Sequence, residues 1–553
     1  MRLKKKLLIF ILGIILVLGF FLRSYKLGDI PGSLNWDEVS WGYSAYSILT
    51  TGEDEYGRFM PTSFEALGDF KQPFYVYSEL IPIKIFGLTP FSTRFPSAFF
   101  GTLSVLFVYF LVKDFFRNTG KEKRFGKLDP EILAVFSAFF FAVSPWSIQF
   151  SRVAYEANTA LFFIISGIWA FVKGFEGAKW KWFFLGTFLI SISSYTYHSS
   201  KVFVPLFFAF LLIYAFFLKR IPKKILFALL LFFVSINSIW LLDSRTTQRG
   251  RSVLFVSNQY LMEIPAREAV YDLNNNYPGT FFHKRPIVFF NKYVENYLSH
   301  FNPVWLFSRG DQERHHPPET GLLYPINLPF ILLGVFFLLY RFKRKYLIMF
   351  TWLLMAPVAS ALAIDSPNAS RSMLMLPVLE ILAAIGLLFF LENILSIKHR
   401  FLGIQIKYFI PIIPLLFFIF YFSYFLHQYY VHTRSEGQIS WQYGYKEAIE
   451  WASNVPKEKK VVFSKDFEKP YIFFLFYMKY DPGKYITEEI SKKVTDKEKC
   501  FNIENNYFGN CKSKLRPNDI YIALNSEEYD KGTLLKTFSY ANGPPAIRIY
   551  ESH

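Results

Sequence analysis

The chain begins MRLKKKLLIFILGIILVLGFFL (residues 1–22), a basic segment followed by an apolar run long enough to cross a bilayer. No small-residue cleavage site follows that run, so we expect an uncleaved transmembrane helix over residues 7–22 and not a signal peptide. Lys4, Lys5 and Lys6 predict a cytoplasmic N-terminus, because basic residues collect on the cytoplasmic side of membrane proteins.

The composition of the whole chain agrees with this beginning. Of 553 residues, 52% are hydrophobic and only 19% are charged, against about 25% in soluble proteins. The charges gather in short runs between apolar stretches of roughly 17–22 residues, each long enough to span a membrane. The formal net charge of +18 would suggest a nucleic-acid partner in a soluble protein. Here the basic residues fall in short loops between apolar stretches, so membrane orientation explains them and no nucleic-acid partner is expected.

We therefore predict a polytopic α-helical membrane protein of the cell (plasma) membrane. Residues 71–87 are apolar but contain Glu79 and Lys84, and counting them as a span would place the basic run Lys121–Lys127 outside. They are predicted to form an interfacial helix instead. With that choice we expect about eleven transmembrane helices, over residues 7–22, 95–113, 131–149, 157–173, 183–197, 202–218, 225–242, 323–340, 346–364, 372–391 and 406–425.

This topology divides the chain into a transmembrane domain, residues 1–426, and a soluble domain, residues 427–553, which is expected outside the membrane. The transmembrane domain carries a first extracytoplasmic loop at 23–94 and a longer one at 243–321. Short alternating runs and turn signals in the soluble domain predict a small α/β or α+β fold. Its two cysteines, Cys500 and Cys511, are either a disulfide or two free thiols.

The first loop contains the segment GSLNWDEVSWGYSAYSIL (residues 32–49), with adjacent acids at Asp37 and Glu38. A carboxylate at the membrane surface can act as a general base on an acceptor hydroxyl or amine. The alternative interpretation is a solvated acid that caps the helix beginning near residue 39.

Four segments together resemble the GT-C glycosyltransferases: WDEVSWGYSAYSI, DFKQPFYVYSELIPIKIFG, RFPSAFFGTLSVLFVYFLVKDFF and SPWSIQFSRVAYEANTALFF. The resemblance is closest to the family-39-type group, which includes dolichyl-phosphate-mannose–protein mannosyltransferases and bacterial lipid A aminoarabinose transferases. It covers roughly the first 220 residues and continues loosely beyond them. It implies an integral membrane enzyme that moves one sugar from a polyprenyl-phosphate donor to a protein, lipid or glycan acceptor. Transfer would occur on the extracytoplasmic face with inversion at the anomeric carbon.

By position, Asp37 matches the catalytic base of the family and Glu38 matches the neighbouring acid that orients the acceptor or the base. Glu156, in SRVAYEAN, matches an acidic position between the third and fourth spans. Lys71 matches the Lys of a Lys-Pro-Pro segment that contacts the donor phosphate. This chain departs from the pattern there, because it has Lys-Gln-Pro at residues 71–73.

An anionic leaving group at headgroup level should draw cations from several elements. The basic side chains near predicted outer span ends are the candidates, although each could instead contact lipid headgroups: Lys71, Arg94, Arg152, His198, Lys201 and Arg371.

Two further features lead to other hypotheses. His315 and His316 could bind a metal together with Asp311 or Glu313, so a divalent cation stays an open alternative although the resemblance requires no cofactor. Glu380 lies near the middle of a predicted span, where an ionisable residue indicates function. It supports the rival hypothesis of a transporter or flippase for lipid-linked saccharides.

Overall fold

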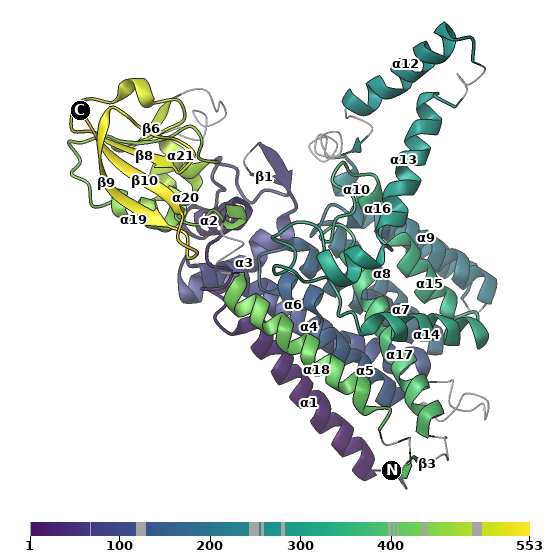
Figure 1. Ribbon diagram of the computed structural model, residues 1–553. Helices are drawn as coiled ribbons and strands as arrows, with labels where there is room; N and C mark the ends of the chain where they lie inside the picture. The colour runs from purple at the N-terminus through teal and green to yellow at the C-terminus, as the bar shows by residue number, and fades with distance from the viewer. Residues whose placement is uncertain are drawn as a thin grey trace. The chain divides into compact units, whose positions relative to one another are not determined.

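The computed structural model (Figure 1) describes residues 2–66, 68–117, 129–177, 179–219, 221–242, 254–255, 259–277, 282–395, 400–401, 404–405, 407, 409–433, 439–488 and 500–553. The predicted basic loop Lys121–Lys127 and parts of residues 243–321 lie outside them. The chain forms two compact units. Unit 1 comprises Met1–Arg23, Phe99–Ser151 and Tyr155–Leu426, and unit 2 comprises Ser24–Ala98, Arg152–Ala154 and His427–His553.

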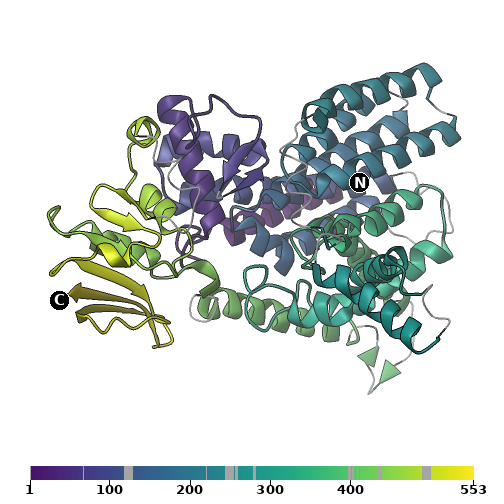
Figure 2. The ribbon, with the colours of Figure 1, turned by 90° about the horizontal axis from the view of Figure 1, so that it is seen from above.

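The described residues of unit 1 are almost entirely helical, and most of these helices are apolar. Among them, α7, α8, α9 and α10 lie side by side (Figures 1 and 2). The helices are α1 (Arg2–Ser24), α4 (Pro90–Phe116, which begins in unit 2), α5 (Pro130–Val143), α6 (Pro145–Ser151), α7 (Glu156–Gly177), α8 (Trp180–Ser194), α9 (Ser200–Leu218), α10 (Lys223–Leu242), α12 (Gln259–Asn274), α13 (Arg285–Ser299), α14 (Asn327–Tyr340), α15 (Tyr346–Met355), α16 (Val358–Ala361), α17 (Leu376–Leu395) and α18 (Ile412–His427). Two short strands, β3 (Arg400–Phe401) and β4 (Ile404–Gln405), pair between α17 and α18.

Close packing of α14 against α17 depends on two glycines. A Cβ atom added at Gly386 would lie 1.8 Å from the backbone oxygen of Phe330, and one at Gly334 would lie 2.1 Å from that of Leu382. Small residues at such contacts let helix backbones approach closely, which is how helices commonly associate in membranes.

The helical membrane class is confirmed, but the predicted count of eleven spans is not. Seven of the described helices are long and apolar enough to cross a membrane, or eight if α5 and α6 form one span. These two are bent by 57° at the break between them, because Pro145 cannot donate the backbone hydrogen bond that would continue α5. Helices α8 and α14 have 15 and 14 residues. At about 1.5 Å per residue they are shorter than the roughly 30 Å apolar core of a bilayer.

Unit 2 combines the first loop with the C-terminal residues. The loop contains α2 (Trp36–Thr51), the hairpin strands β1 (Phe64–Ala66) and β2 (Asp69–Lys71), and α3 (Pro73–Phe86). Where an interfacial helix was predicted, α3 has 14 residues and so is too short for an untilted span. Its Glu79 is buried.

The C-terminal part of unit 2 is a mixed sheet with the order β6-β7-β5-β8-β10-β9. Strand β5 runs parallel to β7 and β8, while the remaining pairs are antiparallel, as expected for a small α/β or α+β fold. Its elements are α19 (Tyr445–Ala452), β5 (Val461–Phe463), α20 (Pro470–Tyr477), α21 (Pro482–Thr487), β6 (Phe501–Ile503), β7 (Asn506–Phe508), β8 (Ile520–Leu524), β9 (Gly532–Ser539) and β10 (Pro545–Ser552). Of the two alternatives for the cysteines, the structure has the Cys500–Cys511 disulfide.

A single hydrophobic core joins the first loop to the C-terminal sheet within unit 2. Helix α2 approaches α20 so closely that a Cβ atom on Gly42 would lie 2.7 Å from the ring of Phe476. The hydroxyl of Tyr43 donates a hydrogen bond to the backbone oxygen of Tyr480 at 3.1 Å. The acidic pair of α2 is therefore held in place partly by residues more than 400 positions later in the chain.

Candidate active site

The acidic pair lies in the first turn of α2, behind an asparagine that caps the helix. Asn35 Oδ1 accepts hydrogen bonds from the backbone N–H groups of Asp37 and Glu38, at 2.9 and 3.1 Å. Glu38 Oε2 in turn accepts from the backbone N–H of Asn35 at 3.1 Å, which completes a capping box. The cap is therefore Asn35 and not Asp37, so the capping role weighed for Asp37 in the sequence is wrong.

Glu38 is fully buried and ion-paired with Arg94. Arg94 Nε donates to Glu38 Oε1 at 2.9 Å and Arg94 Nη2 donates to Oε2 at 3.1 Å. The backbone N–H of Ala154 also donates to Oε1, at 3.0 Å. Together with the N–H of Asn35, four donors surround this carboxylate, as a buried charge requires. The geometry makes Glu38 a positioning group at the start of α2.

Two buried arginines hold the loop that leads into α2. Besides Glu38, Arg94 donates to the backbone oxygens of Leu27, Pro31 and Ser33, at 2.6–3.2 Å. The guanidinium of Arg152 donates to the backbone oxygen of Ile30 at 3.3 Å. It also lies 4.9 Å and 5.3 Å from the ring centroids of Tyr429 and Tyr430, within cation–π distance. These contacts fix the shape of residues 27–33.

Asp37 has different surroundings from Glu38. Its side chain is 28% exposed and its Oδ1 lies 3.1 Å from the Nζ of Lys71, whose side chain is only 9% exposed. A second acid, Asp69, lies 3.8 Å from the same ammonium. These three residues line an open cavity of about 260 Å³ together with Trp36, Ala66, Glu468 and Lys469. The cavity thus offers a carboxylate that can take up a proton beside a cation that can bind an anion.

The other predicted site residues belong to unit 1. Glu156 is buried at the first position of α7. The ammonium of Lys201 lies 5.2 Å from the ring centroid of Trp240, and Arg371 forms an ion pair with Asp365. His198 lies between α8 and α9.

Neither histidine of the pair at 315–316 lies in a metal-binding cluster. His315 Nδ1 lies 3.0 Å from Asp311 Oδ2, whereas His316 Nδ1 lies 2.8 Å from the backbone oxygen of Pro317. Among the described residues, no group of three His, Cys, Asp or Glu side chains is arranged to hold a metal ion. Glu380, the residue that favoured a transporter, is buried in α17 and accepts a hydrogen bond from Asn327 at 3.1 Å.

Several residues of the site were not anticipated from the sequence. Asp69, Glu468 and Lys469 line the cavity of Asp37, and Glu55 is buried close to α2, where it accepts a hydrogen bond from Ser40 at 3.2 Å. Burial, reinforced by the neighbouring charge of Asp54, raises the pKa of Glu55 to about 8. The capping box Asn-x-x-Glu at 35–38 was visible in the sequence; the contacts made by residues 468 and 469 were not.

Comparisons with known proteins agree with the fold. Residues 71–240 match the family model described as dolichyl-phosphate-mannose-protein mannosyltransferase. A curated relative from Bacillus subtilis (strain 168), named "Putative mannosyltransferase YkcB", is 27% identical over 231 residues. The match covers 41% of this chain and 29% of the relative, so the chain corresponds to less than a third of that protein.

Two solved structures are similar over nearly all of the chain. ArnT from Cupriavidus metallidurans in the apo state has a TM-score of 0.53 and 11% identity, with 99% of this chain and 98% of ArnT covered. The Archaeoglobus fulgidus oligosaccharyltransferase tethered with an acceptor peptide has a TM-score of 0.52 and 13% identity, with 100% and 74% covered. At such identities the likeness shows the fold alone. The family model over residues 71–240 and the curated relative together indicate a glycosyltransferase, and the fold of this chain is similar to those of ArnT and the oligosaccharyltransferase.

Proposed function

We propose that this protein transfers a single sugar from a polyprenyl-phosphate donor to an acceptor on the extracytoplasmic face of the membrane, with Asp37 as the general base. The observation that carries the proposal is the partly exposed Asp37 carboxylate, 3.1 Å from the Lys71 ammonium in an open cavity. The donor class is supported by the family model over residues 71–240 and by ArnT, which has been solved bound to undecaprenyl phosphate.

The proposed reaction is a direct displacement. The acceptor hydroxyl or amine loses its proton to the Asp37 carboxylate as its oxygen or nitrogen bonds to the anomeric carbon. The bond from that carbon to the phosphate oxygen breaks on the opposite side, so the configuration inverts. The electron pair of the broken bond leaves with polyprenyl phosphate, and a cation beside the phosphate stabilises the charge that develops there. Lys71 is suited to this role because an ammonium has three N–H donors and can contact an anion as well as Asp37.

The remaining residues of unit 2 act by positioning. Glu38 uses its four hydrogen bonds to fix the N-terminus of α2, and so the backbone that carries Asp37. Arg94 donates to Glu38 and to three backbone oxygens of the loop, which favours a role in holding the loop over a direct contact with the donor phosphate. We extend this role to Arg152.

We also propose that unit 2 faces the extracytoplasmic side, with the N-terminus in the cytoplasm. The lysines at positions 4–6 favour this orientation. The Cys500–Cys511 disulfide supports it, because disulfides persist in oxidising compartments and are rare in the cytosol.

The test is Asp37→Asn, assayed in membranes supplied with a labelled polyprenyl-phosphate sugar. Asn keeps the size of the side chain but cannot take up the proton, so we expect transfer to fall about 10²- to 10⁴-fold. Asp29→Asn is the matched control, because Asp29 is an exposed acid in the same loop outside the cavity. Transfer by Asp37→Asn at the normal rate would refute the assignment, and a product with retained anomeric configuration would refute the single displacement.

A further inference from the structure

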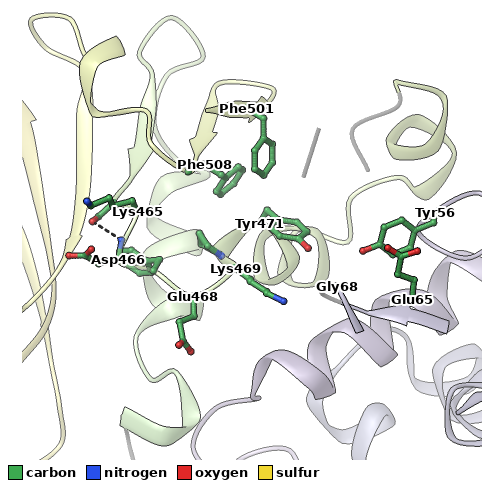
Figure 3. A pocket seen from close by; sticks show the side chains of 14 residues that line it. Tyr56, Glu65, Gly68, Lys465, Asp466, Glu468, Lys469, Tyr471, Phe501 and Phe508 are labelled. Carbon is green, nitrogen blue, oxygen red and sulfur yellow. Dashed lines mark hydrogen bonds between the residues drawn. The ribbon is translucent and has the colours of Figure 1, made fainter. Parts of the chain in front are cut away.

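Unit 2 contains a second cavity, of about 250 Å³, which we call the aromatic cavity (Figure 3). It lies between the β1–β2 hairpin with the loop before it, the β5–α20 segment, and the β6–β7 hairpin. The residues that line it are Tyr56, Glu65, Gly68, Ser464, Lys465, Asp466, Phe467, Glu468, Lys469, Pro470, Tyr471, Phe501, Phe508 and Gly509. The proposed transfer reaction makes no use of most of them.

Rings form one continuous wall of this cavity. The rings of Tyr471 and Phe501 are 5.8 Å apart and those of Phe501 and Phe508 are 5.6 Å apart. Figure 3 shows Tyr471 between this pair of phenylalanines and Tyr56. Phe501 is only partly buried, so part of its ring is open to a ligand. Aromatic rings offer large, rigid apolar faces of the kind that bind the C–H faces of other rings.

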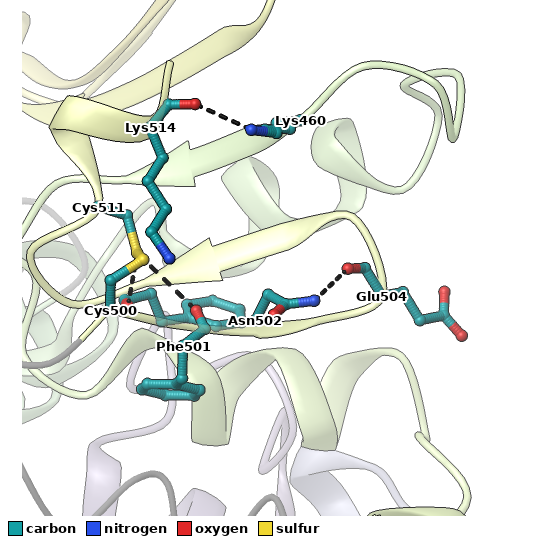
Figure 4. Close-up of a disulfide and its surroundings, with 8 residues drawn as sticks. Lys460, Cys500, Phe501, Asn502, Glu504, Cys511 and Lys514 are labelled. Atoms are coloured by element: carbon teal, nitrogen blue, oxygen red, sulfur yellow. Dashed lines mark hydrogen bonds between the residues drawn. A yellow bond between two sulfur atoms is a disulfide. The ribbon is translucent and has the colours of Figure 1, made fainter. Parts of the chain in front are cut away.

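The Cys500–Cys511 disulfide stabilises the part of this wall formed by Phe501 and Phe508. Phe501 and Phe508 are cross-strand partners in the β6–β7 hairpin. The Cys500–Cys511 bond joins the residue before β6 to the segment that follows β7, and Figure 4 shows it beside Phe501. Cross-linking the hairpin limits the movement of both rings before a ligand arrives. Such preorganisation lowers the entropic cost of binding.

The charges of the cavity argue against an anionic ligand. Three acids line it, Glu65, Asp466 and Glu468, against two lysines, and Glu65 also pairs with Arg58. A phosphate or carboxylate ligand would face like charges. Hydroxyl groups both donate and accept hydrogen bonds, so a ligand rich in them can use the carboxylates and the ammonium groups together. A neutral sugar ring combines such hydroxyls with apolar C–H faces.

The aromatic cavity shares residues with the cavity of Asp37. Glu468 and Lys469 line both. The backbone of Lys469 has a φ of +52°, in the left-handed region that a lysine rarely adopts. Unfavourable backbone conformations of this kind persist where the surrounding structure imposes them, and they are frequent at binding sites. Because the two cavities share Glu468 and Lys469, a ligand held by the rings would extend past these two residues toward Asp37.

We propose that the aromatic cavity binds a neutral saccharide unit of the acceptor, so that the sugar is added to a glycan. The catalytic consequence rests on the proposed function, because it assumes that Asp37 receives the proton of the acceptor. The binding itself does not, and can be measured on its own.

The experiment is saturation-transfer NMR on the full chain in nanodiscs, with Asp37→Asn protein so that no turnover interferes. The probes are the neutral disaccharides maltose, cellobiose and chitobiose, compared with glucose 6-phosphate and a serine-rich peptide. Phe501→Leu keeps an apolar side chain but removes the ring face. Asp466→Asn changes an exposed carboxylate, so we expect the fold to be unchanged. Phe538→Leu in β9 is the matched control, because this partly buried ring lies outside the cavity.

We expect at least one disaccharide to bind. Phe501→Leu should reduce the affinity about 10-fold, which corresponds to about 1.4 kcal/mol. Asp466→Asn should also reduce the affinity, and Phe538→Leu should leave it unchanged. No saccharide binding, preferential binding of the phosphate or the peptide, or equal binding by all variants would overturn the inference. Saccharide binding without sugar transfer by the native protein would instead count against the proposed function. Transfer to a protein or lipid with no saccharide binding would count against the inference alone.

Discussion

Asp37 and Glu38 should respond differently when the carboxylate is replaced by an amide: Glu38→Gln should mainly lower stability, and Asp37→Asn should mainly lower sugar transfer. Glu38→Gln replaces one carboxylate oxygen by an NH₂ group. All four groups around the Glu38 carboxylate are donors: the backbone N–H groups of Asn35 and Ala154 and two nitrogens of Arg94. Whichever way the amide is turned, its NH₂ group faces two donors, and Arg94 loses its buried counter-charge. Breaking a buried ion pair from one side costs about 3–5 kcal/mol.

This cost is measurable as a shift in thermal unfolding. For a domain of about 150–250 residues, the midpoint temperature of unfolding falls by about 2–4 °C for each kcal/mol of lost stability. The purified Glu38→Gln protein should therefore unfold roughly 6–20 °C below the native protein. Asp37→Asn is the control, because its partly exposed ion pair with Lys71 contributes about 1 kcal/mol or less.

The two variants should thus separate stability from catalysis. The Asp37→Asn protein should unfold within a few degrees of the native protein but lose sugar-transfer activity. The Glu38→Gln protein should show its main effect as a lower unfolding temperature. A Glu38→Gln protein with native unfolding behaviour would show that the Glu38–Arg94 pair is not the buried contact described above. A large loss of stability in Asp37→Asn would show that the two acids do not have distinct roles.

Three further changes test other parts of unit 2. Folding raises the pKa of Glu55 from 4.5 to about 8, so the folded state holds its proton more tightly and stability should fall as the pH rises from about 4.5 to 8. Glu55→Gln should therefore gain in unfolding midpoint over the native protein at pH 8 and show a smaller gain at pH 5. Gly42→Ala places a methyl group 2.7 Å from the ring of Phe476, and should cost about 1–3 kcal/mol in chemical unfolding. Replacing both Cys500 and Cys511 by Ser opens a link between residues 11 positions apart, and should cost about 3 kcal/mol in the same measurement, while a loss below 1 kcal/mol would contradict this account.

Structure that depends on neighbouring residues can be predicted from this sequence, whereas structure that depends on contacts between residues far apart in the chain cannot. The apolar runs indicate most of the helices, because burial in lipid is decided locally, residue by residue. They do not give the lengths of the helices: the predicted spans 183–197 and 323–340 become α8 and α14, whose 15 and 14 residues are short for the apolar core of a bilayer. The bend between α5 and α6 follows from Pro145, which the sequence shows but a hydropathy pattern ignores.

The candidate site shows the same limit. The place of the acidic pair after the first span marks it, the resemblance marks Lys71, and the structure brings Asp37 and Lys71 together. The different roles of Asp37 and Glu38 depend on Arg94 and Ala154, whose contacts with α2 span 56 and 116 residues. No local pattern predicts that one of two adjacent carboxylates will be enclosed and the other left open. Lys469 is harder still to predict, since it reaches the site only through the fold of the C-terminal sheet.

The shared core of α2 and the C-terminal sheet has a consequence for how the protein is made. Tyr43 and its hydrogen-bond partner Tyr480 are 437 residues apart. At about 5–20 residues per second, a ribosome takes roughly 20–90 s to extend the chain from one to the other. During that interval the first loop has already been synthesised, but the C-terminal half of its core has not. Helix α2 therefore stays without its partner surface during this interval, and a chain interrupted before residue 470 never completes the core around its acidic helix.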